Sequence, residues 1–125
     1  MIVGTGIDLA EVARIRDAIE RYGERFLQRV YTAHELAYVG DKANRYERYA
    51  ARFAAKEAGM KALGTGWRRG VTWHDFEVTN LASGRPTLSF HGVAAEVARN
   101  LGVRNIALSL THTAELGMAF VILES

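Results

Sequence analysis

The amino-acid sequence predicts an α+β fold in which an antiparallel sheet packs on a long central helix. Strand-like and helix-like segments are mixed along the chain without the regular strand–helix–strand order of a parallel sheet. A long alanine-rich stretch, Tyr46–Leu63, has strong helix propensity. The length of 125 residues fits a single domain, 1–125, with a core small enough that oligomerisation would help to stabilise it.

The spacing of apolar residues indicates the elements of the first half. Residues 2–7 resemble a short strand with two glycines. In Leu9–Tyr22 apolar residues recur every three or four positions, which predicts an amphipathic helix. Thr32 and Glu35 form a Thr-x-x-Glu capping box, so a further helix should begin directly after Thr32.

The second half should begin with the long helix and continue mainly as strands. Gly64 follows the alanine-rich stretch and is the expected helix stop. The other predicted elements are a strand over 71–79, a turn over Asn80–Pro86, a strand over Thr87–Phe90, a helix over Val93–Leu101, and strands over Asn105–His112 and Met118–Leu123.

The composition excludes several kinds of chemistry. The chain has no cysteine, which rules out disulfides, thiolate nucleophiles and zinc sites built from cysteine. Its first residues lack the basic and apolar regions of a signal peptide, and no stretch is long and apolar enough to cross a bilayer. We therefore expect a cytoplasmic protein without a membrane partner.

Basic residues are concentrated in one part of the chain. Between Lys42 and Arg69 there are eight lysines and arginines but only two acidic residues, Glu47 and Glu57. This segment has a net charge of +6 and the rest of the chain −4, which together make the overall +2. Such a local excess predicts an anionic ligand bound at one place. It lacks the sustained basic stripe of a nucleic-acid-binding protein.

Two carboxylates far apart in the chain are candidate metal ligands. Asp8 stands where the first strand runs into the first helix, and Glu57 lies in the long helix among small and apolar residues. Mg²⁺ is usually held by one or two carboxylates together with water and substrate phosphates. Simpler roles also fit, because Asp8 could cap a helix and Glu57 could form an ordinary surface pair with Lys61.

Other polar residues are candidates for binding phosphate. Lys61 lies one helical turn after Glu57, and His112 ends a predicted strand, where it could donate to a phosphate, transfer a proton or serve the structure alone. Gly64 and Gly66 would let backbone amides approach a phosphate, although a helix stop followed by a loop explains them equally well. The glycine-rich motifs of P-loop and dinucleotide-binding folds are absent from the sequence.

Four blocks of sequence stand out together: residues 4–9 with Arg14, residues 52–66, Asn80 with Gly84-Arg85-Pro86, and Ser109-Leu110-Thr111-His112-Thr113. In order and spacing they resemble the holo-acyl-carrier-protein synthase family of 4′-phosphopantetheinyl transferases. The resemblance runs from about residue 3 to residue 123, and block 52–66 is its most specific part. Thr111 departs from the pattern, since serine is more usual there, but it keeps the hydroxyl group.

The resemblance implies a role for each of these residues. Asp8 and Glu57 would hold Mg²⁺, with Mn²⁺ as an alternative, and Arg52 would contact the 3′-phosphate of coenzyme A. The full set expected at coenzyme A is Arg52, Lys61, Gly64, Gly84, Arg85, Pro86, Thr111 and His112. An acyl carrier protein would dock on Arg14, Arg21 and Arg25, although by their spacing alone these arginines also fit a solvated face of mixed charge.

The implied reaction moves 4′-phosphopantetheine from coenzyme A to a serine of an apo-acyl carrier protein, for fatty acid biosynthesis, and releases adenosine 3′,5′-bisphosphate. Such transfers depend mainly on positioning and on neutralising phosphate charge, here by the metal and Lys61. We expect Glu57 to accept the proton of the serine hydroxyl, with His112 as the less favoured acceptor. The resemblance also implies a homotrimer with active sites at subunit boundaries.

Two other functions are alternatives. The first is a phosphopantetheinyl transferase that serves peptide or polyketide synthases, but such enzymes usually resemble two of these domains in tandem. The second is a nucleic-acid-binding module that would use the basic residues of Lys42–Arg69 on phosphates, with Trp67 and Trp73 for stacking. This module would leave Asp8, Glu57 and His112 without a role.

Overall fold

The computed structural model describes residues 1–66 and 68–125, so the predicted role of Trp67 lies outside the described residues. The larger sheet has the strand order β1–β5–β4, with β1 Ile2–Glu11, β4 Asn105–His112 and β5 Leu116–Glu124. A separate hairpin pairs β2 (Phe76–Asn80) with β3 (Pro86–Phe90). The helices are α1 (Val12–Tyr22), α2 (Glu24–Val30), α3 (Ala33–Val39), α4 (Arg45–Leu63) and α5 (Gly92–Asn100), with a short 3₁₀ helix η1 (Trp73–Asp75).

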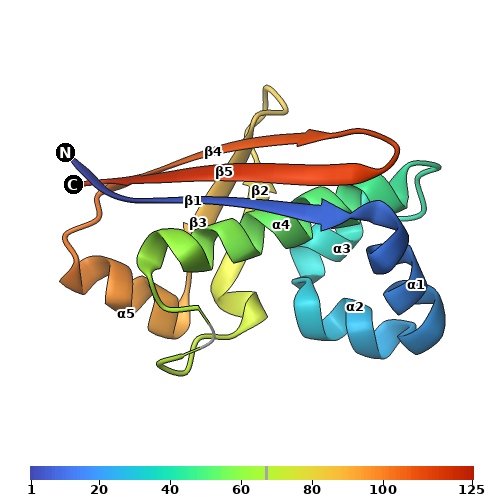
Figure 1. Cartoon of the computed structure of the whole chain (residues 1–125), viewed down its shortest axis with the longest axis horizontal. Coiled ribbons are helices and arrows are strands. Elements are labelled where there is room, and N and C mark those ends of the chain that lie inside the picture. Colours follow the sequence, from blue (N-terminus) through green and yellow to red (C-terminus); the bar gives the residue numbers. More distant parts are fainter. Residues whose placement is uncertain (67) are drawn as a thin grey trace.

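Helix α4 runs along one face of the three-stranded sheet (Figure 1). Helices α1, α2 and α3 lie at one end of the molecule and α5 at the other, on the same side of the sheet as α4. The core lies between α4 and the sheet, where Ala54, Ala58, Val121 and Leu123 are completely buried. All strand pairs are antiparallel, which confirms the predicted α+β class with an antiparallel sheet on a long helix. No helix in the described part of the chain could span a membrane.

Glycines let the sheet approach α4 more closely than other residues would. A Cβ atom on Gly6 would lie 1.9 Å from the carbonyl oxygen of Ala58, and one on Gly4 would lie 2.1 Å from that of Ala62. Only a residue without a side chain allows such a close backbone approach. The contact therefore brings β1 directly against the C-terminal half of α4.

The predicted boundary between the first strand and the first helix was wrong. The strand continues to Glu11 and the helix begins at Val12, because Asp8 and the residues after it pair with β5, Asp8 lying opposite Ala119. The N-cap of α1 is Glu11, which makes no side-chain cap hydrogen bond. Asp8 is therefore not a helix cap, and its side chain is available for another role.

Two other predictions differ from the structure. Helix α2 was not predicted, because its seven residues are too few to show a clear helical period. The strand expected over 71–79 is instead η1 followed by β2, since Asp75 donates its N–H to the carbonyl of Thr72 and turns the chain. The capping box is confirmed. Thr32 Oγ1 accepts a hydrogen bond from the backbone N–H of Glu35 at 3.2 Å, and Glu35 Oε1 accepts one from the backbone N–H of Thr32 at 2.8 Å.

Replacing Gly6 with alanine should separate β1 from α4, because the new Cβ would meet a backbone oxygen that cannot move aside. We expect the free energy of unfolding, measured by urea denaturation, to fall by about 3 kcal/mol or more. Gly102→Ala is the matched control: its Cβ would meet nothing within 4 Å, and its positive φ should cost only about 1 kcal/mol. Equal losses in the two variants would contradict the close packing.

Candidate functional site

Asp8, Glu57 and Lys61 meet where β1 lies against α4, and we call these three residues the acidic half-site. Lys61 Nζ donates to Asp8 Oδ1 at 2.9 Å and to the carbonyl of Ile7 at 3.0 Å. The Asp8 side chain is 14% exposed and that of Lys61 55% exposed. Glu57 precedes Lys61 by one turn of α4, so both side chains emerge on the same face of the helix. The two predicted carboxylates are thus brought together from distant parts of the chain.

The carboxyl groups of the acidic half-site repel each other. Partial burial raises the pKa of Glu57, and the neighbouring charge of Asp8 raises it further, while Lys61 lowers it in part. A positive charge beside two neighbouring carboxylates favours their ionised forms. Lys61 supplies one through Asp8 Oδ1, which leaves Glu57 less well compensated.

The donor set of the acidic half-site fits Mg²⁺. Within residues 1–66 and 68–125 no group of three or more histidine, aspartate or glutamate side chains could hold a metal. A closed zinc site, which needs four protein ligands, is therefore not formed there. Asp8 and Glu57 provide the one or two carboxylates that Mg²⁺ takes when water and substrate phosphates supply the other ligands.

Arg52 is buried and forms no salt bridge with an acidic side chain of residues 1–66 and 68–125, although the charge of Glu35 offsets part of the effect of burial on its pKa. It is 4% exposed, and its Nε has no hydrogen-bond partner. Its other contacts are long, 3.4 Å from Nη2 to Asn80 Oδ1 and 3.5 Å from Nη1 to the carbonyl of Arg48. The guanidinium also lies 4.8 Å from the ring centre of Tyr38, and burial lowers its pKa. A buried cation so poorly compensated favours an anionic ligand at this place.

The β2–β3 turn lies beside Arg52. Asn80, which contacts Arg52 through Oδ1, uses its Nδ2 to donate to the carbonyl of Gly84 at 3.0 Å. Gly84 has a φ of 91°, a value that favours glycine, and the exposed Arg85 follows it. We call the residues that meet here the basic half-site: Arg52, Asn80, Gly84, Arg85 and Pro86.

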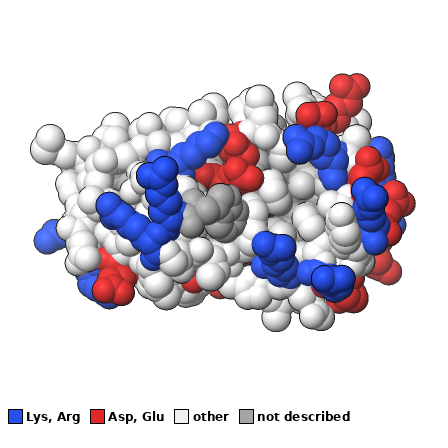
Figure 2. Space-filling view, turned by 60° about the horizontal axis from the view of Figure 1, so that its bottom comes forward, with Lys and Arg blue, Asp and Glu red and all other residues white. Residues whose placement is uncertain are grey.

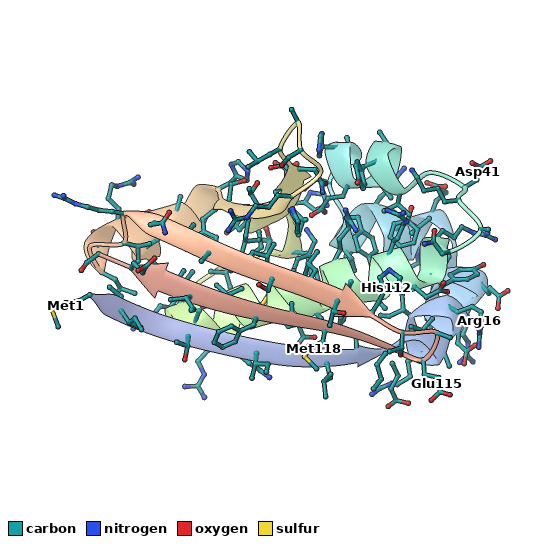
Figure 3. All side chains as sticks on the ribbon, turned by 90° about the horizontal axis from the view of Figure 1, so that it is seen from above. Met1, Arg16, Asp41, His112, Glu115 and Met118 are labelled. Atoms are coloured by element: carbon teal, nitrogen blue, oxygen red, sulfur yellow. The ribbon has the colours of Figure 1, made fainter. Side chains whose placement is uncertain are left out.

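His112 lies apart from the acidic half-site. It pairs with Gly117 of β5, which packs against the backbone of Ala50 and Ala51 in the N-terminal half of α4. Asp8 and His112 thus lie on the two outer strands of the sheet, β1 and β4, with β5 between them. Figure 3 shows His112 at the end of β4, at the strand edge away from β1. One chain does not bring all the predicted active-site residues together.

Thr111 and Gly64 have settings that the sequence did not indicate. Thr111 pairs with Met118 and is exposed, so the alternation along β4 directs it to the sheet face opposite to that of His112. Gly64 ends α4 with a φ of 77°, and its N–H is bonded to the carbonyls of Met60 and Lys61. Any contribution of Gly64 to phosphate binding would therefore come from close approach rather than from its N–H.

The three arginines expected at a carrier protein are exposed on two helices. Arg14 and Arg21 lie on α1, and Arg25 lies on α2. Phe26, next to Arg25, stacks on Phe53 with ring centres 6.5 Å apart, and Phe53 is one turn before Glu57 on α4. These helices therefore border the acidic half-site. In Figure 2 an acidic patch near the middle of the helix side has basic side chains on both sides of it.

An apolar pocket was missed by the sequence analysis. It has a volume of about 900 Å³, and its lining is mainly apolar with polar side chains among it: Phe26, Gln28, Arg29, Val30, Phe53, Val71, Thr72, Trp73 and His74. Its walls come from α2, α4 and η1, two of which were not predicted, so no local pattern could have revealed it. The Trp73 ring lies against Phe53, with ring centres 4.7 Å apart.

Comparison with known proteins identifies the family. Residues 4–114 match the family model described as the 4′-phosphopantetheinyl transferase superfamily. The chain belongs to this superfamily. It is 71% identical over 125 residues to a holo-[acyl-carrier-protein] synthase of Solibacter usitatus, with 100% of both chains covered. The family resemblance of the four sequence blocks is therefore confirmed.

Solved structures of the 4′-phosphopantetheinyl transferase superfamily share the fold. The crystal structure of holo-[acyl-carrier-protein] synthase from Neisseria meningitidis matches with a TM-score of 0.90 at 30% identity, covering 100% of both chains. That of the Helicobacter pylori synthase in complex with coenzyme A matches with a TM-score of 0.84 at 26% identity, covering 96% of this chain and 99% of the other. The predicted fold is confirmed over the full chain.

Replacing Glu57 with glutamine should stabilise the fold at pH 7. The pKa of Glu57 is raised in the folded state, so its ionised form opposes folding, and this penalty disappears as the pH falls to the unfolded value of about 4.5. The free energy of unfolding, measured in urea, should therefore be higher for Glu57→Gln than for the wild type at pH 7.5 and equal to it at pH 4. Glu47→Gln, in the first turn of the same helix, should give no gain, because a carboxylate is favourable there. A loss for Glu57→Gln at pH 7.5 would contradict this account.

Proposed function

We propose that the chain transfers 4′-phosphopantetheine from coenzyme A to a serine of an acyl carrier protein, and so acts in fatty acid biosynthesis. The meeting of Asp8, Glu57 and Lys61 in a member of this superfamily carries the proposal. Its relatives from Solibacter usitatus and Neisseria meningitidis bear the name holo-[acyl-carrier-protein] synthase. We place this activity in one domain, 1–125, and in the cytoplasm.

Coenzyme A would bind across the two half-sites. The Helicobacter pylori relative was solved in complex with coenzyme A. The ligand carries a diphosphate and a 3′-phosphate, and the chain offers two separate groups of cations. Lys61 at the acidic half-site would contact the diphosphate, and the poorly compensated Arg52 would contact the 3′-phosphate. The turn at Gly84, Arg85 and Pro86 would border the adenosine.

The acidic half-site would carry the chemistry. Asp8 and Glu57 would hold Mg²⁺ or Mn²⁺, which would supply Lewis-acid stabilisation of charge on the diphosphate. Lys61 would leave Asp8 for the phosphate oxygens and offset the charge of the leaving group. Glu57 would accept the proton of the serine hydroxyl. His112 would act as a donor to phosphate.

The carrier protein would dock on the helices that border the acidic half-site. Arg14, Arg21 and Arg25 are exposed there and would attract an acidic helix of the carrier, mainly by raising the association rate. The apolar pocket beside Phe26 and Phe53 would receive an apolar side chain of the same helix. The serine would then lie next to Glu57.

A homotrimer with sites at subunit boundaries would complete the active site. The uncovered face of the three-stranded sheet carries exposed apolar side chains, which Figure 3 shows from above with Met118 labelled. They are Ile2, Ile7, Leu9, Leu116, Met118 and Phe120. Exposed apolar patches of this kind mark association surfaces. Association through this face would allow His112 of one copy to reach the acidic half-site of another.

A transfer assay tests the proposed function. Protein, coenzyme A, Mg²⁺ and an apo-acyl carrier protein should yield a carrier with the added mass of phosphopantetheine, and excess chelator should stop the reaction. Asp8→Asn and Glu57→Gln should each lower turnover by about 100-fold or more. Glu96→Gln, an exposed glutamate of α5, should keep it. An unmodified carrier, or full turnover by Glu57→Gln at saturating Mg²⁺, would refute the proposal.

Mixing two inactive variants tests the shared site. Asp8→Asn and His112→Ala should each be inactive in a pure trimer, but their random mixture should recover about a quarter of wild-type turnover, since some boundaries would combine two intact halves. Phe120→Asp should abolish both the trimer, measured by light scattering, and the recovery. A monomeric wild type, or a mixture no more active than its components, would count against the shared site.

A further inference from the structure

An ion pair lies completely buried between α3, α4 and β2. The side chains of Lys56 and Glu35 are 0% exposed, and Lys56 Nζ lies 2.7 Å from Glu35 Oε1. Lys56 also donates to the carbonyls of Phe76, at 2.5 Å, and Trp73, at 3.3 Å. Glu35 accepts further hydrogen bonds from the backbone N–H groups of Thr32 and Val78. Each proton of the ammonium group thus has an acceptor.

This pair needs an explanation other than stability. Burial lowers the pKa of Lys56, and Glu35 restores it only in part. Two charges withdrawn from water gain little over a well-packed apolar pair of the same size, so a buried ion pair is weak evidence for stabilisation. What it does impose is geometry, because its hydrogen bonds allow only one arrangement of the three elements.

Arg52, the buried cation of the basic half-site, contacts residues of the same three elements. Arg52 lies one turn before Lys56 on α4, and its neighbours are Tyr38 on α3 and Asn80 on β2. A shift of α4 relative to β2 would separate Arg52 from Asn80, whose contact is already 3.4 Å long. The acidic half-site does not depend on Lys56 in this way, since β1 holds Asp8 against Lys61.

We propose that Lys56 and Glu35 are a positioning pair for Arg52. They hold α3, α4 and β2 in the one arrangement that presents the Arg52 guanidinium to a phosphate. The pair touches neither the ligand nor the reacting atoms, so it governs the affinity for coenzyme A rather than the rate of transfer. This inference rests on the proposed function, in which Arg52 binds the 3′-phosphate.

The test is a double variant, Lys56→Met with Glu35→Gln, which removes both charges and keeps the volume. Single removal of Lys56 would leave a buried carboxylate unpaired and destabilise the fold. In transfer assays with the double variant, KM for coenzyme A should rise at least about tenfold while kcat stays within about twofold, the pattern of lost ground-state binding. With 3′-dephospho-coenzyme A as donor, KM should barely change, so the preference for the 3′-phosphate should fall.

Two controls separate positioning from general damage. Val97→Ala, a buried position on the distant α5, should lower stability and leave KM for both donors unchanged. Arg52→Gln should lose the preference for coenzyme A over its dephospho form. If Arg52→Gln keeps that preference, the proposed contact of Arg52 and the positioning role are both overturned. The positioning role alone is overturned if Arg52→Gln loses the preference for coenzyme A while the double variant keeps that preference, shows a fall in kcat only, or fails to fold. None of these outcomes bears on the proposed transferase activity of the wild-type chain.

Discussion

The backbone contact between β1 and α4 is the constraint on which the acidic half-site depends. Gly6 lies against Ala58, and two residues later the same strand presents Asp8 to Lys61, one turn further along the helix. A side chain at Gly6 would lift the strand and with it the carboxylate. The pairing of β1 with β5 adds a second restraint, because it fixes which residues of β1 face the helix. Two conditions, a glycine and a strand register, therefore place the carboxylate of Asp8 beside that of Glu57.

Helix α4 packs against several elements, and each of its faces has a composition that suits the element it contacts. Alanines such as Ala54 and Ala58 allow the sheet to lie close, while Lys56 is buried against β2 and α3. Glu57 and Lys61 emerge on a third face beside β1. Charges on the helix are thus compensated to very different degrees. Lys56 is completely buried and each of its protons has an acceptor, so it is not available to a ligand, whereas the Nε of Arg52 has no hydrogen-bond partner in the described part of the chain.

The sequence predicted what depends on local patterns and on the family resemblance. The capping box at Thr32 and the long helix were correct, because their signals lie within a few residues. Leu9–Tyr22 has the period of a helix, yet its first residues are strand, since pairing with β5 overrides local periodicity. The burial of Lys56 was not predictable, because its partner Glu35 lies in another helix. The same reason hid the apolar pocket, whose walls meet only in the folded chain.

The two half-sites would contribute differently to the proposed reaction, one to the affinity for coenzyme A and the other to the rate of transfer. Coenzyme A carries negative charge at both of its phosphate-bearing parts, but only the diphosphate changes during transfer. Contacts at the 3′-phosphate persist from substrate to transition state and so contribute affinity, while contacts at the diphosphate can strengthen as charge develops and so contribute rate. Arg52, which is buried and contacts Asn80 of β2, suits the first task. Lys61, more than half exposed and bound to a carboxylate that it can leave, suits the second. A positioning pair beneath Arg52 would then affect binding alone.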